Sequence, residues 1–303
     1  MGKPSKRNHS ALQDSLAAIV VWYEPTEDYL NNIKTYVFDV GHTWVIDNSV
    51  DDHSELLSSM GSVTYISLGR NYGIAHALNI GCQAACDANY EYILTMDQDS
   101  AFYMTQLETH LEYGFKVFKD RQVAIVAVGV EETLEGHLLE LKNCSSAITS
   151  GNLLRLAAWS AVGGFDKKLF IDQVDHEFCY RLRKNNYIIL KNTAVSMNHQ
   201  VGEPITGVFL GRHIRSTNHA WVRRYYHFRN SLYLRQQYPE YSKPFYLFLR
   251  DLGDQCIGII LLEDKIGQKF LGMIFGAWDF LRGRYGAWED NHPDKTSKET
   301  INS

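Results

Sequence analysis

Two aspartates separated by one residue, Asp97 and Asp99, are a pair of side chains whose spacing suggests chemistry. They follow the apolar run YEYILTM, which is typical of a buried strand, so they are expected at its carboxyl end. Residues i and i+2 of a strand point the same way, and two such carboxylates can bind one hard divalent cation. That cation would neutralise a departing diphosphate. A solvated turn is the alternative interpretation of this pair.

A second polar triplet, Asp47, Asn48 and Ser49, closes the strand-like run HTWVID. An aspartate there can accept the imino proton of a pyrimidine base, whereas a turn or a helix cap is the structural alternative. The segment GRNYG, which contains Asn71 and Gly73, opens a helix with many backbone donors and suits an anion. The alternative for that segment is a capped helix packed closely on a sheet.

A third acidic cluster lies in the segment GGFDKKLFIDQVDHEFCYRLRK, which carries Asp172, Asp175 and Glu177. The helix dipole favours carboxylates in a first helical turn, and that effect alone could account for them. The same residue types also serve as general bases. The sequence leaves both interpretations open here.

Strand-like and helix-like segments alternate over the first two thirds of the chain, which predicts a mainly parallel α/β sheet. Ligands of such sheets bind at the carboxyl ends of the strands, where the aspartate triplets are expected. The expected strands are 16–22, 42–47, 63–68, 92–97, 122–130 and 187–197, and the expected helices are 26–38, 72–88, 152–161 and 172–184.

After about Glu203 the sequence predicts long helices without intervening strands. Trp221, Tyr225, Phe228 and Leu232 share one face of the first of these helices, which Pro239 ends. Two aromatic-rich helices are expected over 244–262 and 264–281. Between 206 and 250 eight Lys and Arg face a single Glu, so we expect this region to meet something anionic.

The 303 residues carry a net charge of -5, which argues against a general nucleic-acid binder. The five cysteines form no CxxC pair and no zinc spacing, so a reducing compartment fits. The polar, basic first ten residues do not resemble a signal peptide, and no apolar run is long enough to span a membrane. These features predict a cytoplasmic protein.

Taken in order, the triplets DNS and DQD, the GGFD segment, the acidic cluster and the C-x-R-x-R run resemble the family 2 glycosyltransferases. The pattern is most similar to bacterial enzymes that use dTDP-L-rhamnose for surface polysaccharides. The resemblance is strong from Leu16 to Glu203 and loose beyond. It implies the GT-A fold of nucleotide-diphospho-sugar transferases over 11–205, a helical C-terminal extension over 206–290 and a loose tail over 291–303.

The resemblance also assigns roles to particular positions. Asp175 corresponds to the general base, with Glu177 and Asp172 as rivals because Val174 replaces an acidic residue common in the family. The remaining roles follow the same alignment. The donor-binding positions are Asp47, Asn48, Asn71, Gly73, Asp97 and Arg229, and the positions that would hold Mg²⁺ or Mn²⁺ are Asp97, Asp99 and His199. A structural role is the alternative for His199, and a solvated helix face is the alternative for Arg229.

The resemblance implies an inverting transfer of L-rhamnose from dTDP-L-rhamnose to a saccharide. The acceptor implied by the resemblance is a polyprenyl-diphosphate-linked saccharide of polysaccharide or O-antigen synthesis. The C-terminal helices would then lie on the cytoplasmic face of the inner membrane, or else pack on the core or form a homodimer. The alternatives in function are a UDP-sugar-dependent galactosyl- or glucosyltransferase, a non-catalytic donor-binding subunit, and a sugar-nucleotide pyrophosphorylase, whose Gly-rich signature near the first strand is absent.

Overall fold

The computed structural model describes residues 14–58, 60–103, 105–130, 141–199, 205–209 and 211–293. The chain divides into two compact units. The first holds the described residues within Met1–Asp166 and Val174–Gln200, and the second those within Lys167–Gln173 and Val201–Ser303. The short segment Lys167–Gln173, which carries Asp172 of the acidic cluster, therefore belongs with the C-terminal residues. The domain boundaries expected from the sequence stay a prediction.

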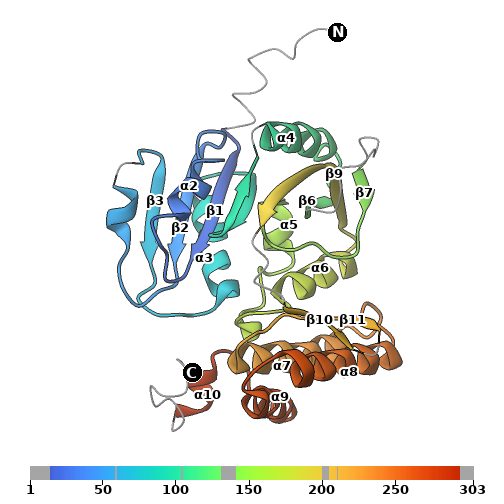
Figure 1. Ribbon diagram of the computed structural model, residues 1–303. Helices are drawn as coiled ribbons and strands as arrows, with labels where there is room; N and C mark the ends of the chain where they lie inside the picture. Colours follow the sequence, from blue (N-terminus) through green and yellow to red (C-terminus); the bar gives the residue numbers. More distant parts are fainter. Residues whose placement is uncertain are drawn as a thin grey trace. The chain divides into compact units, whose positions relative to one another are not determined.

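The first unit is built on one mixed sheet with strand order β3-β2-β1-β4-β8-β6-β9-β5, with β7 paired to β9 (Figure 1). The pairs β1–β2, β2–β3, β1–β4 and β6–β9 are parallel, whereas β8, β5 and β7 run antiparallel to their neighbours. The strands are β1 Leu16–Trp22, β2 His42–Asp47, β3 Val63–Ser67, β4 Tyr92–Asp97, β5 Ser100–Phe102, β6 Val123–Val130, β7 Leu141–Asn143, β8 Asn152–Arg155 and β9 Ile188–His199. This architecture confirms the predicted α/β fold class.

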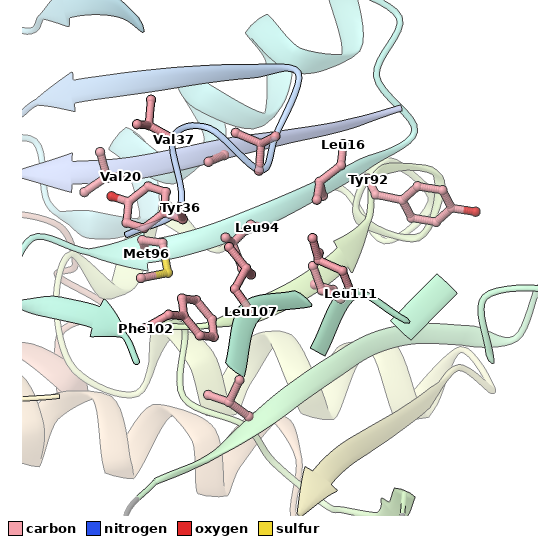
Figure 2. Packing of buried hydrophobic residues seen from close by; sticks show 14 of the residues in the cluster. Leu16, Val20, Tyr36, Val37, Tyr92, Leu94, Met96, Phe102, Leu107 and Leu111 are labelled. Carbon is pink, nitrogen blue, oxygen red and sulfur yellow. The ribbon is translucent and has the colours of Figure 1, made fainter. Parts of the chain in front are cut away.

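Helices cover both faces of this sheet because the central strand is apolar on both sides. All seven residues of β1 are buried. Leu16 and Val20 join a cluster with Tyr36 and with Leu107 and Leu111 (Figure 2). The helical segments of this unit are α2 Tyr29–Ile33, η1 Ser54–Leu57, α3 Ile74–Asp87, α4 Gln106–Val117, α5 Leu156–Ala161 and α6 Val174–Lys184.

On the opposite face, α3 lies directly against β1. A Cβ atom added to Gly81 would come within 2.6 Å of the Ile19 side chain, so only glycine allows this approach. The alternation along β1 thus places Ile19 toward α3 and its neighbours toward α2 and α4. A parallel strand that is buried on both faces has a continuous apolar sequence, and the run LAAIVVW correctly predicted such a strand.

Two expected helices of the first unit differ in the structure. The segment 152–161 begins with the strand β8, where Leu153 and Leu154 are buried between β4 and β6, and only its second half forms α5. Periodicity cannot distinguish a short buried strand from a buried helix in such an apolar run. The expected helix 26–38 is reduced to α2, followed by turns. Its Asn and Thr residues favour turns over helix.

The second unit contains the helices α7 Trp221–Gln237, α8 Phe245–Leu262, α9 Ile266–Leu281 and α10 Trp288–Asn291, and the 3-10 turn η2 Lys167–Leu169. The prediction of no strands here is wrong. The strands β10 Ile205–Phe209 and β11 Arg212–Ser216 form an antiparallel hairpin, whose short length and polar residues give little sequence signal. The first residues of the expected tail are held in place, since Asn291 ends α10 and His292 Nε2 lies 2.7 Å from Asp279 Oδ2.

The buried face of α7 differs from the expected stripe. Tyr225, Arg229, Asn230 and Tyr233 are buried, whereas Phe228 is only partly so. Close contact with α9 selects this face, because a Cβ atom on Gly276 would lie 2.6 Å from the Tyr225 carbonyl oxygen. Among the described residues no helix combines the length and the apolar character needed to cross a bilayer.

Candidate active site

The parallel strands bring the two aspartate triplets to one edge of the sheet. In the register of β1, Trp22 is the partner of Asp47 on β2, and Val21 is the partner of Asp97 on β4. Neighbouring strands lie about 5 Å apart, so the two aspartate backbones are separated by roughly 10 Å. The chain order reverses direction at β1, and such switch points are where open α/β sheets bind ligands.

The turn that carries Asp97 and Asp99 is held by Gln98. The Gln98 side chain accepts a hydrogen bond from the Tyr23 backbone N–H at 2.8 Å and donates to the Tyr23 carbonyl oxygen at 3.1 Å. The Gln98 carbonyl oxygen accepts from the Asn32 side chain at 2.8 Å. Residues 98 and 99 form a turn between β4 and β5. The strand alternation assumed from the sequence therefore does not extend to Asp99.

Asp97 and Asp99 are half-buried carboxylates, a donor type that Mg²⁺ and Mn²⁺ accept. Beside Asp97 the buried Tyr36 hydroxyl has no hydrogen-bond partner among the described residues, and burial together with the Asp97 charge raises the pKa of Tyr36. Mg²⁺ in nucleotide enzymes is commonly held by one or two carboxylates plus substrate phosphates. These residues therefore fit such a cation as part of a shared site.

A site made only of protein ligands is not seen in the described part of the chain, where no three His, Cys, Asp or Glu side chains are grouped for a metal. The backbone of His199 pairs with Ser100, the residue after Asp99. The His199 side chain lies outside the described residues. Its role as a metal ligand stays a prediction.

Asp47 is fully buried, and its carboxylate is engaged within the first unit. Oδ2 accepts hydrogen bonds from the Tyr65 hydroxyl and from His53 Nδ1, both at 2.7 Å, and Oδ1 accepts from the Ser49 backbone N–H at 2.9 Å. The last of these bonds closes a turn, as the structural interpretation expected. A direct contact between Asp47 and a base stays a prediction, and it would require one of these partners to move.

The predicted donor-binding residues Asn48, Asn71 and Gly73 are linked by hydrogen bonds. The Asn48 amide donates to Asn71 Oδ1 at 2.9 Å, and that oxygen also accepts from the Gly73 backbone N–H at 2.9 Å. Asn48 Oδ1 accepts from the Tyr72 backbone N–H at 2.8 Å. Gly73 has a φ of 84°, which favours glycine, and it precedes α3 directly. The end of β2 and the start of α3 are thereby fixed together.

The three candidate bases have different surroundings. The partly buried Asp175 accepts a hydrogen bond from the His176 backbone N–H at 2.8 Å, and the described residues provide it with no ion-pair partner. Glu177 is buried and receives two hydrogen bonds from Arg181, at 2.9 and 2.7 Å. Asp172 belongs to the second unit and pairs with Arg223 at 3.2 Å. Both rivals are thus engaged by arginines.

Asp175 also lines a small cavity together with Thr95, Asn152 and Cys179. The cavity measures ≈ 10 Å³, which is space for about one water molecule. Asn152 Oδ1 is buried without a hydrogen-bond partner among the described residues. Burial, with the Asp175 charge contributing, raises the pKa of the Cys179 thiol to about 12, so Cys179 stays protonated and unreactive.

Arg229 lies in the interior of the second unit, and its predicted donor-binding role stays a prediction. It is fully buried, so it does not lie on a solvated helix face. Its guanidinium donates to the carbonyl oxygens of Gly286, Lys168 and Leu169, and to the Tyr225 hydroxyl. A donor phosphate would have to displace these bonds. The described contacts make Arg229 a link between segments of the second unit.

Most basic residues of the 206–250 region also meet partners within the protein. Arg224 pairs with buried Glu263 at 2.6 Å, and Lys243 pairs with Asp251 at 2.6 Å. Arg223 pairs with Asp172 as described above. The expected anionic partner of this region is therefore supplied in large part by its own acidic side chains.

Sequence reasoning missed several residues that hold the site. His53 and Tyr65 bind Asp47, and Ser150 accepts a hydrogen bond from the Asp97 backbone N–H at 3.1 Å. Only His53 carried a sequence signal, because it lies six residues after Asp47 in DNSVDDH. The other contacts join residues far apart in the chain, which no local pattern reveals.

Comparisons with known proteins show the family of the chain. The model of the family described as "Glycosyl transferase family 2" matches residues 43–143. The chain is 30% identical over 306 residues to the dTDP-rhamnosyl transferase RfbF of Shigella flexneri, across 92% of this chain and 100% of that protein. It is 24% identical over 207 residues to the low-salt glycan biosynthesis hexosyltransferase Agl10 of Haloferax volcanii, across 61% of this chain and 67% of that protein.

Among solved structures, GalNAc-T7 with UDP, GalNAc and Mn²⁺ superposes with a TM-score of 0.51 at 13% identity. The match covers 61% of this chain and 43% of that one. This likeness concerns the fold alone.

Proposed function

Because the chain belongs to the family 2 glycosyltransferases, we propose that it transfers L-rhamnose from dTDP-L-rhamnose to a saccharide acceptor in polysaccharide synthesis. The identity of 30% to a dTDP-rhamnosyl transferase over that protein's whole length supports the choice of donor. In the structure, one observation carries the proposal. Asp47 and Asp97 end the two strands that flank β1, as a base site and a diphosphate site of one nucleotide require.

The proposed reaction is a single in-line displacement. Asp175 takes the proton of an acceptor hydroxyl, the oxygen attacks the anomeric carbon, and the bond from that carbon to the diphosphate oxygen breaks. The nucleoside diphosphate leaves and the configuration at the anomeric carbon inverts. Asp97 and Asp99 would hold Mg²⁺ or Mn²⁺, which offsets the negative charge that develops on the leaving diphosphate.

Asp175 is favoured as the base over its rivals by its surroundings. A general base needs a carboxylate that can exchange a proton with substrate. The oxygens of Glu177 and Asp172 are occupied by their arginine partners, Arg181 at 2.7 Å and Arg223 at 3.2 Å. Asp175 has no such partner among the described residues.

A donor panel tests the proposed function. Binding and turnover would be measured with dTDP-L-rhamnose, UDP-galactose, UDP-glucose and a GDP-sugar, each with Mg²⁺, with Mn²⁺ and with EDTA. We expect turnover of dTDP-L-rhamnose that EDTA abolishes. Faster turnover of a UDP-sugar than of dTDP-L-rhamnose would show that the donor is a UDP-sugar. Donor binding without any turnover would favour a non-catalytic subunit.

For the acceptor, we propose a saccharide linked to a polyprenyl diphosphate, with the C-terminal helices in peripheral contact with the inner membrane. Exposed apolar side chains on α8 and α9 support this contact, among them Ile260, Leu271, Ile274, Trp278 and Leu281. Ile274, Trp278 and Leu281 line an apolar groove of ≈ 530 Å³ formed by α7, α8 and α9. A homodimer that covers the same face is the alternative.

A further inference from the structure

The base site contains a histidine that reaches solvent where the aspartate does not. The Asp47 side chain has an exposed fraction of 0%, whereas that of His53 is 20% exposed. Three hydrogen bonds already use most of the acceptor positions of the Asp47 carboxylate. The His53 imidazole is therefore more accessible to a ligand than the Asp47 carboxylate.

The hydrogen bond to Asp47 fixes which nitrogen of His53 carries the proton. A carboxylate only accepts hydrogen bonds, so His53 Nδ1, which lies 2.7 Å from Asp47 Oδ2, must donate. In the neutral ring Nε2 then bears the lone pair. This tautomer is assigned from the hydrogen-bond network, as is usual for histidine.

The imidazole is also held through its backbone. The His53 N–H donates to the Tyr65 hydroxyl at 2.8 Å, and that hydroxyl donates to Asp47 Oδ2 at 2.7 Å. Tyr65 and Asp47 come from the paired strands β3 and β2. Among the described residues the His53 side chain contacts Asp47 through Nδ1, and none is a partner of its Nε2. The result is a preoriented acceptor at the carboxyl end of β2.

We propose that His53 Nε2 accepts the N3 imino proton of the donor's pyrimidine base, and that Asp47 is a positioning residue that fixes the tautomer of His53. This inference rests on the proposed function, because it assumes a nucleotide donor at this strand end. Thymine and uracil both carry a proton at N3, so both would be accepted. Cytosine carries a lone pair at N3, and its repulsion from the Nε2 lone pair would exclude it.

The test is the binding of dTDP and of N3-methyl-dTDP, measured by calorimetry at pH 8 on the full chain. Wild type should bind N3-methyl-dTDP about 5- to 150-fold more weakly, the range expected when a buried hydrogen bond is lost. His53→Phe should weaken dTDP binding by a similar factor and should no longer distinguish the two ligands. The matched control His42→Phe, at the other end of β2, should behave as wild type.

If His53→Phe still binds N3-methyl-dTDP more weakly than dTDP by the same factor as wild type, the inference is overturned. Another residue would then accept the N3 proton. If His53→Phe does not fold, nitrogen NMR of histidine-labelled wild type gives the answer. The Nε2 resonance of His53 should move with dTDP, and its failure to move on saturation with dTDP would also overturn the inference.

The same measurements separate this inference from the proposed function. Wild type that binds neither dTDP nor UDP would overturn both. If wild type binds dTDP and N3-methyl-dTDP equally well, the inference about His53 is overturned, but the proposed function is not. Binding with the expected penalty but without rhamnose transfer would support His53 and count against the proposed donor sugar.

Discussion

At the residue scale, the surroundings of each acidic side chain decide what it can do. Asp47, Asp175 and Glu177 are all at least partly buried, yet their hydrogen-bond partners differ. Asp47 contacts a histidine and a tyrosine, Asp175 accepts from a backbone N–H, and Glu177 accepts from an arginine. An arginine partner keeps a carboxylate ionised and occupied, which suits a structural role. The carboxylate without a cationic partner among the described residues is the better candidate for proton transfer.

Replacing Asp175 with Asn tests that assignment. We expect turnover to fall by about 10²- to 10⁴-fold, because the amide cannot accept the acceptor's proton, while donor binding is kept. Steady-state kinetics and calorimetry with the nucleoside diphosphate measure the two effects. Asp172→Asn is the matched comparison and should keep turnover near that of wild type. Equal losses in the two variants would contradict the assignment.

His110 gives a pH dependence at the same scale. It is fully buried between Gly151, whose carbonyl oxygen it contacts at 3.0 Å, and Asn192, and burial lowers its pKa from 6.5 to about 4. Between these two values the unfolded chain binds a proton that the folded chain does not. The folded state is therefore fully favoured above pH 6.5 and loses roughly 3 kcal/mol as the pH falls to about 4.

The prediction is checked by urea unfolding of wild type and His110→Gln at several pH values between 7 and 4. The variant should be less stable at pH 7, since its packing is poorer, but its free energy of unfolding should fall less steeply with acid. The difference in slope should reach about 1.4 kcal/mol per pH unit. Parallel slopes would show that His110 is not held neutral in the folded state.

At the element scale, a single asparagine on α7 holds a strained loop. Phe170, Asp172 and Gln173 all have positive φ values, 65°, 63° and 64°. The Asn230 amide donates to the carbonyl oxygens of Leu169, Ile171 and Asp172 at 2.8 to 2.9 Å. These hydrogen bonds compensate a backbone conformation that non-glycine residues seldom adopt.

Asn230→Ala should therefore destabilise the second unit. We expect a loss of about 1–3 kcal/mol, because buried carbonyl oxygens lose their donor. Thermal unfolding followed by circular dichroism measures the change. Gln236→Ala, on an exposed position of the same helix, is the control and should unfold like wild type. A variant as stable as wild type would mean that Arg229 and the surrounding packing suffice to hold the loop.

At the scale of the whole molecule, the second unit presents an exposed apolar face. The helices α8 and α9 of the second unit expose Ile274 at 61%, Trp278 at 48% and Leu281 at 76%. Many basic side chains of that unit are engaged by acidic partners. Contact with a membrane is therefore expected to depend more on apolar burial than on attraction to anionic lipid.

Flotation with liposomes tests this expectation. Wild type should float with vesicles of phosphatidylcholine and phosphatidylglycerol, and raising the salt from 0.1 to 0.5 M should change the bound fraction little. Ile274→Asp should reduce binding strongly. Phe38→Asp, which alters an apolar residue of the first unit exposed at 84%, should leave it unchanged.

The dimer alternative gives a different result in the same experiment. Wild type would then fail to float but sediment as a dimer, and Ile274→Asp would sediment as a monomer. A wild-type chain that neither floats nor dimerises would contradict both interpretations of the exposed face.

The sequence by itself determined the α/β fold class, the family and the carboxyl strand ends that carry Asp47 and Asp97, because buried parallel strands are continuous apolar runs. Local patterns failed where a long-range partner decides the outcome. The strand β8 exists because β4 and β6 flank it, and Arg229 is buried because distant carbonyl oxygens surround it. Likewise, only the pairing of β2 with β3 brings Tyr65 to Asp47 and fixes His53 beside them. These contacts join residues that are far apart in the chain, or whose local pattern fits more than one structure. Only the tertiary structure could therefore reveal them.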